Sequence, residues 1–233
     1  MKTLLRFLQS IACLWLAVGI SAPLYGGIII NSYRFAAAAA GINLLASISA
    51  YSSTGHDITT GSINSSGATL LIVALADRAT GSHTISDSKG NTWTALTGRT
   101  GGSLSQQTLY YCLSPTVGSG HTFSSTCGAA SYPALAVTAW NGVSGFDKSA
   151  GASSTTQAGS ITPAQNNSLI IFHATALTDA VSVSSGFTLH QNIVQHGNNY
   201  TIGLSYLIQA TASAINPTIS PSAFWGVTQA CFY

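Results

Sequence analysis

The stretch that decides the fold is TLLIVALA at residues 69–76, and SLIIFHAT at residues 168–175 follows the same pattern. Both runs are apolar at nearly every position, and turn-forming residues flank them. A strand buried on both faces has this pattern, because consecutive side chains of a strand point to opposite faces. A short buried helix could have the same composition, but the length and the flanking turns favour strands. We therefore predict two central strands of a layered β fold.

Outward from these runs, short apolar or alternating segments recur about every ten residues between clusters of Gly, Ser, Asn and Pro. This spacing is typical of an antiparallel sandwich or barrel. The further predicted strands lie at residues 46–51, 82–86, 92–97, 107–113, 121–125, 134–140, 187–193, 200–208 and 223–232.

The composition supports an all-β protein. Charged residues make up 5% of the 233 residues, against about a quarter in an ordinary soluble domain. There is no glutamate, although Glu and Lys normally cover the exposed faces of helices. The formal net charge is +2 and no basic run occurs, so a nucleic-acid partner is not expected.

The N-terminal segment differs from the rest of the chain. Residues 1–26 have a positively charged start, an apolar stretch at 7–20 and then small residues, which is the order of a secretory signal peptide. An apolar anchor or arm that stays attached is the alternative. We predict that residues 27–45 are a linker or arm and that 46–233 form the folded body.

The body has two similar halves, at about residues 46–141 and 142–233. The matching segments are 61–76 with 159–176, 108–115 with 203–210, and 134–141 with 223–230. Two Greek-key halves that close on each other would form a jelly roll. Two tandem domains of about 90 residues are the alternative, but no Pro-rich or charged linker separates the halves. We predict a jelly-roll-like antiparallel β-sandwich.

The segment DSKGNTWTAL, residues 87–96, has the residues of a tight turn. Asp87 can cap its own backbone, and Gly90 can adopt a positive φ. Oxygen ligands from Asp87 and Asn91 could instead hold calcium or a sugar. Because one carboxylate is few for calcium, we predict a hairpin turn.

No motif predicts catalysis. The chain has no Gly-x-Ser-x-Gly sequence and no phosphate-binding glycine loop, and its only acids are five aspartates. The six histidines lack the spacing of a zinc site. His173 lies within an apolar run, where a hydrogen-bonded core histidine is expected. We predict that the protein is not an enzyme, with no catalytic residue, no metal and no cofactor.

Cysteines and aromatic residues provide the remaining candidates. Cys112 and Cys127 flank one hairpin and could form a disulfide in an oxidising compartment; small buried hydrophobic residues are the alternative. A second group could form a ligand-binding or subunit interface, or could belong to the core. Its members are Trp93, Tyr110, Tyr132, Trp140, Tyr200 and Trp225.

The order of these segments resembles a known group of domains. The series TLLIVALA (69–76), DSKGNTWTAL (87–96), TLYYCLSPTVGSGHTF (108–123), ALAVTAWNGVSG (134–145) and NSLIIFHAT (167–175) is similar to jelly-roll domains of tailed-phage virion proteins and bacterial exported surface proteins. The resemblance covers about residues 46–233 and rests on strand-and-turn patterns. It implies a jelly roll without shared catalytic residues.

The resemblance also implies a function. It suggests a structural protein of an extracellular assembly: a capsid decoration or tail component of a phage virion, or an exported filament subunit. The expected partners are further copies of the chain, with a trimer by analogy, and neighbouring assembly subunits. A secreted carbohydrate-binding or adhesion module, with a glycan as partner, is the alternative.

Overall fold

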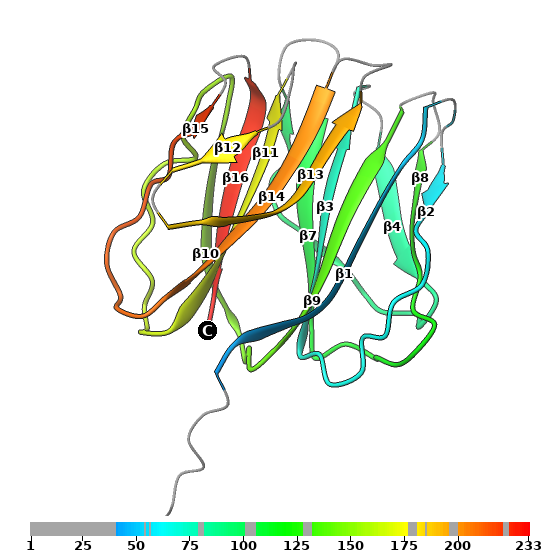
Figure 1. The fold of residues 1–233 in the computed structure, drawn as a ribbon, viewed down its shortest axis with the longest axis horizontal. Coiled ribbons are helices and arrows are strands. Elements are labelled where there is room, and N and C mark those ends of the chain that lie inside the picture. The colour runs from blue at the N-terminus through cyan, green and yellow to red at the C-terminus, as the bar shows by residue number, and fades with distance from the viewer. Residues whose placement is uncertain are drawn as a thin grey trace, which may run out of the picture. The chain divides into compact units, whose positions relative to one another are not determined.

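The computed structural model describes residues 41–53, 55, 57–78, 82–100, 106–127, 132–176, 181–184, 186–195, 200–220 and 224–233. Within these residues all regular structure is β-strand, and every strand pair is antiparallel (Figure 1). The prediction of an all-β, antiparallel sandwich is therefore confirmed. No described helix could cross a membrane. The predicted leader at 1–26, and the arm up to residue 40, lie outside the described residues.

Every predicted strand overlaps an observed one. The strands are β1 (Asn43–Tyr51), β2 (Ile58–Thr59), β3 (Leu70–Asp77), β4 (His83–Asp87), β5 (Thr94–Ala95), β6 (Arg99–Thr100), β7 (Gln106–Leu113), β8 (Phe123–Cys127), β9 (Ala134–Asn141), β10 (Phe146–Ser153), β11 (Ser168–Ala176), β12 (Ser182–Val183), β13 (Thr188–Gln195), β14 (Tyr200–Gln209), β15 (Ile219–Ser220) and β16 (Phe224–Phe232). β10 is the one long strand that the sequence did not predict, because FDKSAGAS lacks an alternation of large apolar residues. β1 begins within the predicted arm.

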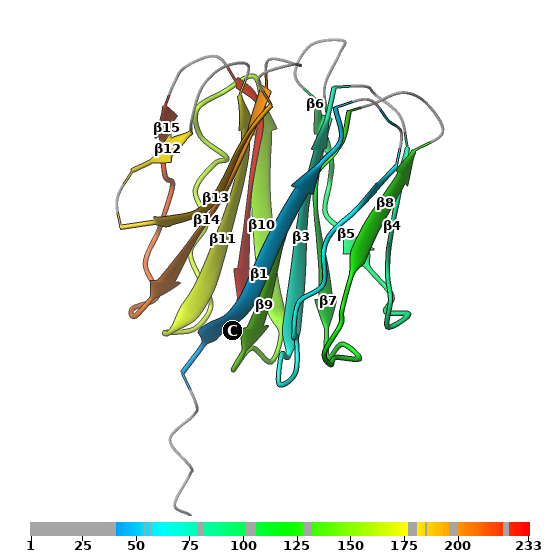
Figure 2. The ribbon, with the colours of Figure 1, turned by 45° about the vertical axis from the view of Figure 1, so that its right-hand side comes forward.

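The described strands form four sheets that are stacked as layers (Figures 1 and 2). The first main sheet has the order β1-β9-β3-β7-β5, with β6 also on β7, and the second main sheet has the order β10-β16-β11-β14-β13. The first outer sheet is β2-β8-β4, and the second outer sheet is β12-β15. The two main sheets pack face to face, and each outer sheet covers the free face of one of them.

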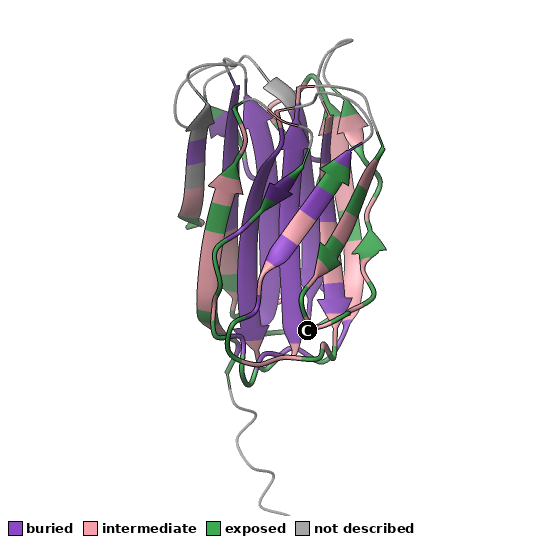
Figure 3. Cartoon of the chain, turned by 90° about the vertical axis from the view of Figure 1, so that its right-hand side faces the viewer, coloured by how far each residue is buried: buried purple, intermediate pink, exposed green. Residues whose placement is uncertain are grey.

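Three apolar layers lie between these sheets. Leu70 and Ile72 of β3 face the central layer together with Ile171 of β11, whereas Leu71 faces the first outer layer and Phe172 the second. All residues of β3 and β11 are buried (Figure 3). The prediction that both apolar runs are central strands buried on both faces is confirmed. The physical reason is that the alternating side chains of each strand pack into two apolar layers, one on each face of its sheet.

Strand pairing follows the same order in both halves. In the first half β1 pairs with β9, β3 with β7 and β4 with β8; in the second half β10 pairs with β16, β11 with β14 and β12 with β15. Trp140 lies opposite Leu70, and Phe232 lies opposite Leu169. Residues 134–141 therefore correspond to 226–233 and not, as the sequence predicts, to 223–230. The difference is three residues, because strand pairing rather than composition sets the register.

Candidate functional site

The polar residues of the first outer layer form two clusters at opposite ends of the same strands. Strand β4 creates this arrangement because its side chains alternate: His83 and Asp87 point inward, whereas Thr84 and Ser86 are exposed. Asp87 lies beside the turn that follows β4. His83 lies at the other end, beside Asp77 at the end of β3.

Asp87 organises the turn at its end of the layer. Its Oδ1 accepts hydrogen bonds from the backbone N–H of Lys89 at 2.8 Å and from Asn91 Nδ2 at 3.2 Å, and its Oδ2 accepts one from Trp93 Nε1 at 2.8 Å. Gly90 has a φ of +74°. The tight turn, with Asp87 as the cap and Gly90 in the left-handed region, is confirmed. The prediction that it is a hairpin turn is wrong, because β4 pairs with β8 and β5 pairs with β7, in two different sheets.

Asn91 links this turn to the loop between β7 and β8. Its Oδ1 accepts a hydrogen bond from the Thr116 N–H at 2.6 Å, and its Nδ2 donates to the Thr116 carbonyl at 2.9 Å. The oxygens proposed as calcium or sugar ligands are thus already engaged by donors of the protein. The arrangement therefore favours the structural role of the turn over ion binding.

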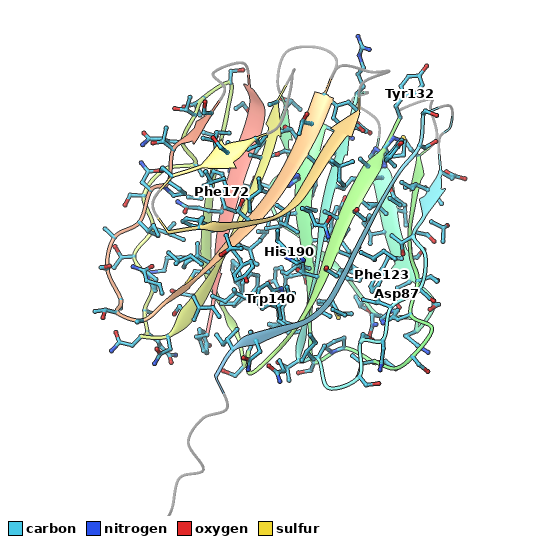
Figure 4. The ribbon with its side chains drawn as sticks, in the orientation of Figure 1. Asp87, Phe123, Tyr132, Trp140, Phe172 and His190 are labelled. Atoms are coloured by element: carbon cyan, nitrogen blue, oxygen red, sulfur yellow. The ribbon has the colours of Figure 1, made fainter. Side chains whose placement is uncertain are left out.

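His121 extends the cluster into a Ser–His–Asp chain. Its Nε2 lies 3.1 Å from Asp87 Oδ1, and its Nδ1 shares a hydrogen bond with Ser65 Oγ at 2.8 Å. The imidazole stacks on Phe123 with 4.3 Å between ring centroids, and Figure 4 shows Phe123 and Asp87 close together in this layer. Ser65 and His121 are fully buried, so a substrate could not reach the hydroxyl. The hydrogen-bonded Ser65, His121 and Asp87 side chains hold three loops together, and this buried arrangement is not suited to nucleophilic catalysis.

The pKa of Asp87 reflects this environment. Burial by itself raises the pKa of the carboxyl group, but hydrogen bonds from the Lys89 backbone, His121, the Asn91 backbone and Trp93 stabilise the carboxylate. Together they outweigh burial, so the pKa of Asp87 is lowered from its ordinary value.

The second cluster joins three strand ends. Asp77 ends β3, His83 begins β4 and Cys127 ends β8, where Cys127 is the cross-strand partner of His83. Asp77 Oδ2 contacts His83 Nε2, and one potential ligand atom from each of the three residues lies within 4.8 Å of the other two. Ser125 Oγ lies 2.9 Å from His83 Nδ1, and Gln106 Nε2 lies 3.4 Å from Asp77 Oδ2.

A cavity of about 330 Å³ adjoins this cluster. His83 and Gln106 line it together with Tyr110. Burial raises the pKa of Tyr110, and the negative charge of Asp77 raises it further. Carboxylate, imidazole and thiol groups therefore meet beside an accessible space. This group was not predictable from the sequence, because His83 and Cys127 are brought together only by the pairing of β4 with β8.

Most predicted aromatic candidates belong to the core. Trp140 and Tyr200 are buried in the central layer, and the Tyr200 hydroxyl donates to the carbonyl of the half-buried Tyr132. Trp93 packs edge-on against Phe123, so it is held inside the first outer layer. Figure 4 shows how far Trp140 and Tyr132 lie apart.

The remaining two aromatic candidates differ from these four. Tyr110 lines the 330 Å³ cavity. The side chain of Trp225, in β16, lies outside the described residues. The six aromatics therefore do not form one exposed ligand platform in the part of the chain that the structure describes.

The candidate Cys112–Cys127 disulfide does not form in this structure, where both residues are free. Cys112 is paired with Leu71 near the start of β3, whereas Cys127 lies near Asp77 at its end. Six residues of strand span about 20 Å, and a disulfide needs Cα atoms within about 7 Å. Both thiols are buried, as the alternative of small buried hydrophobic residues predicts.

His173 corrects a further prediction. It is fully buried, as expected, but neither ring nitrogen has a hydrogen-bond partner among the described residues. Burial lowers its pKa from 6.5 to about 3. His173 is therefore a neutral imidazole in the native protein near pH 7.

Comparisons with protein-family models, with curated proteins and with solved structures gave no match to this chain.

Proposed function

We propose that this protein is a non-enzymatic structural subunit of an extracellular assembly, either a tailed-phage virion component (capsid decoration or tail) or an exported filament subunit. We also propose that its body is the jelly-roll-like antiparallel sandwich with two similar halves that the sequence predicts. The uncharged edge formed by β1 and β13 carries the proposal, because it suits contact between copies of the chain.

The strand pairing supports the jelly-roll description. The first strand of each half pairs with the last. Nested inside this pair are β2–β8 and β3–β7 in the first half, and the Ile161–Ile215 bridge and β11–β14 in the second half. Strand β9 also pairs with β3, and β16 with β11. An antiparallel ribbon wound around a barrel produces this combination of nested and crossed pairs.

The β1–β13 edge is unusual for a protein that stays monomeric. β1 lies against β13 where the two main sheets stack, and each is the last strand of its sheet among the described residues. Natural sheets protect long edges with charged residues or proline, but neither NLLASISAY nor TLHQNIVQ contains any. Leu45, Tyr51 and Leu189 are exposed on these strands. The opposite edge strand, β10, carries Asp147 and Lys148.

The two buried groups of serine, histidine and aspartate side chains support a role without catalysis. Ser65 and Ser125, the hydroxyl groups nearest to His121 and His83, are both fully buried. Each lies on the Nδ1 side of its histidine, with an aspartate on the Nε2 side. In hydrolytic triads the aspartate holds Nδ1 and the nucleophile meets Nε2. The observed order suits the fastening of loops and strand ends.

Lysine substitutions on the proposed edge test the assembly. We expect the full chain to form a defined oligomer in native mass spectrometry and light scattering. The double variant Ser49→Lys/Leu189→Lys should weaken association about tenfold or more, because like charges would meet at the contact. The matched control Thr84→Lys/Thr126→Lys adds the same charge to the exposed face of the first outer sheet and should assemble normally.

Two outcomes would count against the proposal. If the wild-type protein stays monomeric at high concentration, the proposed self-association is rejected. If proteomics does not detect the protein in purified particles, the proposal of a virion component is rejected. A glycan array distinguishes the proposed assembly subunit from the alternative function, a secreted glycan-binding module. Reproducible binding to one glycan class by a monomeric chain would favour that module instead.

A further inference from the structure

We propose that Asp77, His83 and Cys127 bind one transition-metal ion of the Zn²⁺ class at the end of the first outer layer. This site is additional to the proposed assembly function and does not depend on it. It contradicts the prediction from the sequence that the chain holds no metal.

The donor atoms determine the class of ion. A thiolate, an imidazole and a carboxylate together are ligands of Zn²⁺ and related ions, whereas Ca²⁺ and Mg²⁺ prefer oxygen ligands alone. Two ligands of a tetrahedral zinc ion lie about 3.5 Å apart. The potential ligand atoms of Asp77, His83 and Cys127 already lie within 4.8 Å of one another, so small side-chain adjustments would complete the geometry.

Burial gives the ion a physical role. The side chains of Asp77 and His83 are 0% and 1% exposed, and a carboxylate in such a place needs compensation for its lost hydration. A carboxylate and a thiolate each carry one negative charge, and a neutral imidazole carries none. One divalent cation would therefore balance the charge of these three ligands.

Neighbouring side chains already orient the ligands. Ser125 Oγ, at 2.9 Å, occupies the Nδ1 side of His83, while His83 Nε2 faces Asp77. Gln106 Nε2 lies 3.4 Å from the Asp77 carboxylate. Metal-binding histidines commonly hold their second ring nitrogen in this manner, because the contact fixes the ring and its tautomer.

The second half of the chain provides an internal comparison. Asp77 lies seven residues after Leu70, and Ala176 lies seven residues after Leu169, which occupies the equivalent register. The second outer layer is closed by Ala176 with Phe172, Val181 and Ile219. Since apolar residues close that layer, the fold itself does not require a buried aspartate at this position. The polar cluster therefore indicates a role beyond packing.

Three protein ligands leave the fourth position of a tetrahedral ion for another donor. His83 lines the 330 Å³ cavity as well as the cluster. A water molecule or a small external donor in this cavity could fill the position. We therefore expect an exchangeable site rather than a closed structural zinc site with four protein ligands.

Titration with Co²⁺ tests the proposal directly. The reduced, metal-free full chain should bind one equivalent of Co²⁺ and develop both the visible bands of a tetrahedral ion and a thiolate charge-transfer band, and Zn²⁺ should bleach them. The variant Cys127→Ser should lose the charge-transfer band. Ser125→Ala removes only an orienting contact and should weaken Co²⁺ binding about 10- to 100-fold. His83→Gln and Asp77→Asn each remove a ligand, so each should weaken Co²⁺ binding more than Ser125→Ala does.

Cys112→Ser is the matched control, because Cys112 is another buried thiol of the same layer. It should keep the full cobalt spectrum. Spectra unchanged by Cys127→Ser, or no cobalt spectrum with the folded wild type, would overturn the proposal. Should Cys127→Ser not fold, alkylation of the wild type decides the matter: Zn²⁺ should protect Cys127 but leave the rates at Cys112 and Cys231 unchanged, and equal rates at Cys127 with and without Zn²⁺ would reject the site.

Discussion

The carboxylate of Asp87 accepts a hydrogen bond from the indole nitrogen of Trp93 at 2.8 Å, across the turn that joins β4 to β5. The indole packs edge-on against Phe123 of β8, with 6.1 Å between ring centroids. One aspartate thus connects the turn to the apolar packing of the first outer layer. Its loss should affect both.

Asp87→Ala should destabilise the protein by about 3 kcal/mol, because it leaves Trp93 Nε1 and His121 without their shared acceptor inside the layer. Urea denaturation at pH 7 measures the change in the free energy of unfolding. Ser86→Ala, at the exposed neighbouring position, is the control and should change it by less than about 0.5 kcal/mol. Equal effects of the two variants would contradict the role given to Asp87.

Acid should lower the free energy of unfolding of the wild-type protein, because it protonates the same carboxylate. The pKa of Asp87 is lower in the folded protein than its ordinary value of 3.8, so the unfolded chain binds the proton first. The stabilisation is complete above pH 3.8 and is lost as the pH falls through the folded pKa. Denaturation curves of the wild type and Asp87→Asn should converge in this acidic range. A constant difference between them would count against this linkage.

His173→Leu should reduce the pH dependence of the free energy of unfolding at a higher pH than the range in which Asp87 titrates. The folded imidazole has a pKa of about 3, whereas its ordinary value is 6.5. Between these values the unfolded chain is protonated and the native chain is not, so stability falls by up to about 1.4 kcal/mol per pH unit on acidification. The leucine variant should lack this loss when unfolding is measured from pH 7 to pH 4. Parallel curves would show that His173 does not titrate in this way.

Gly151→Ala should destabilise β10 by about 1–3 kcal/mol, the usual cost of overpacking. A Cβ at Gly151 would lie 2.7 Å from Arg99 Nε and 2.8 Å from the Val227 carbonyl oxygen. Gly41→Ala is a suitable control, because its Cβ would meet nothing within 4 Å. Thermal unfolding of both variants compares the two positions, and a neutral Gly151→Ala would mean that β10 lies further from Arg99.

Reducing agents should leave the stability of the folded body unchanged. Cys112 and Cys127 are free in this structure, whereas a native disulfide would contribute about 2–4 kcal/mol. Denaturation with and without dithiothreitol should therefore give the same free energy of unfolding. Peptide mass spectrometry of protein alkylated after unfolding should find both cysteines labelled without prior reduction. A Cys112–Cys127 cross-linked peptide would contradict the observed pairing.

The strands were predictable because their signal is local. Alternation or continuous apolarity along a few residues reports whether one or both faces of a strand are buried, and β3 and β11 are clear examples. The turn at Asp87 and Gly90 was predictable for the same reason, since its hydrogen bonds join residues close in sequence. β10 was missed because its small residues adapt to Arg99 and Val227, which lie far away in the chain.

The sequence by itself determined the all-β class, the two strands buried on both faces and the turn after β4, because side-chain periodicity and glycine conformation act within a few residues. Only the tertiary structure decided the four-layer stacking, the burial of Trp140 and Tyr200, and the separation of Cys112 from Cys127. It also decided that Asp77, His83 and Cys127 meet. Those relationships depend on which distant strands pair and in which register, and one sequence does not encode that choice in any local pattern.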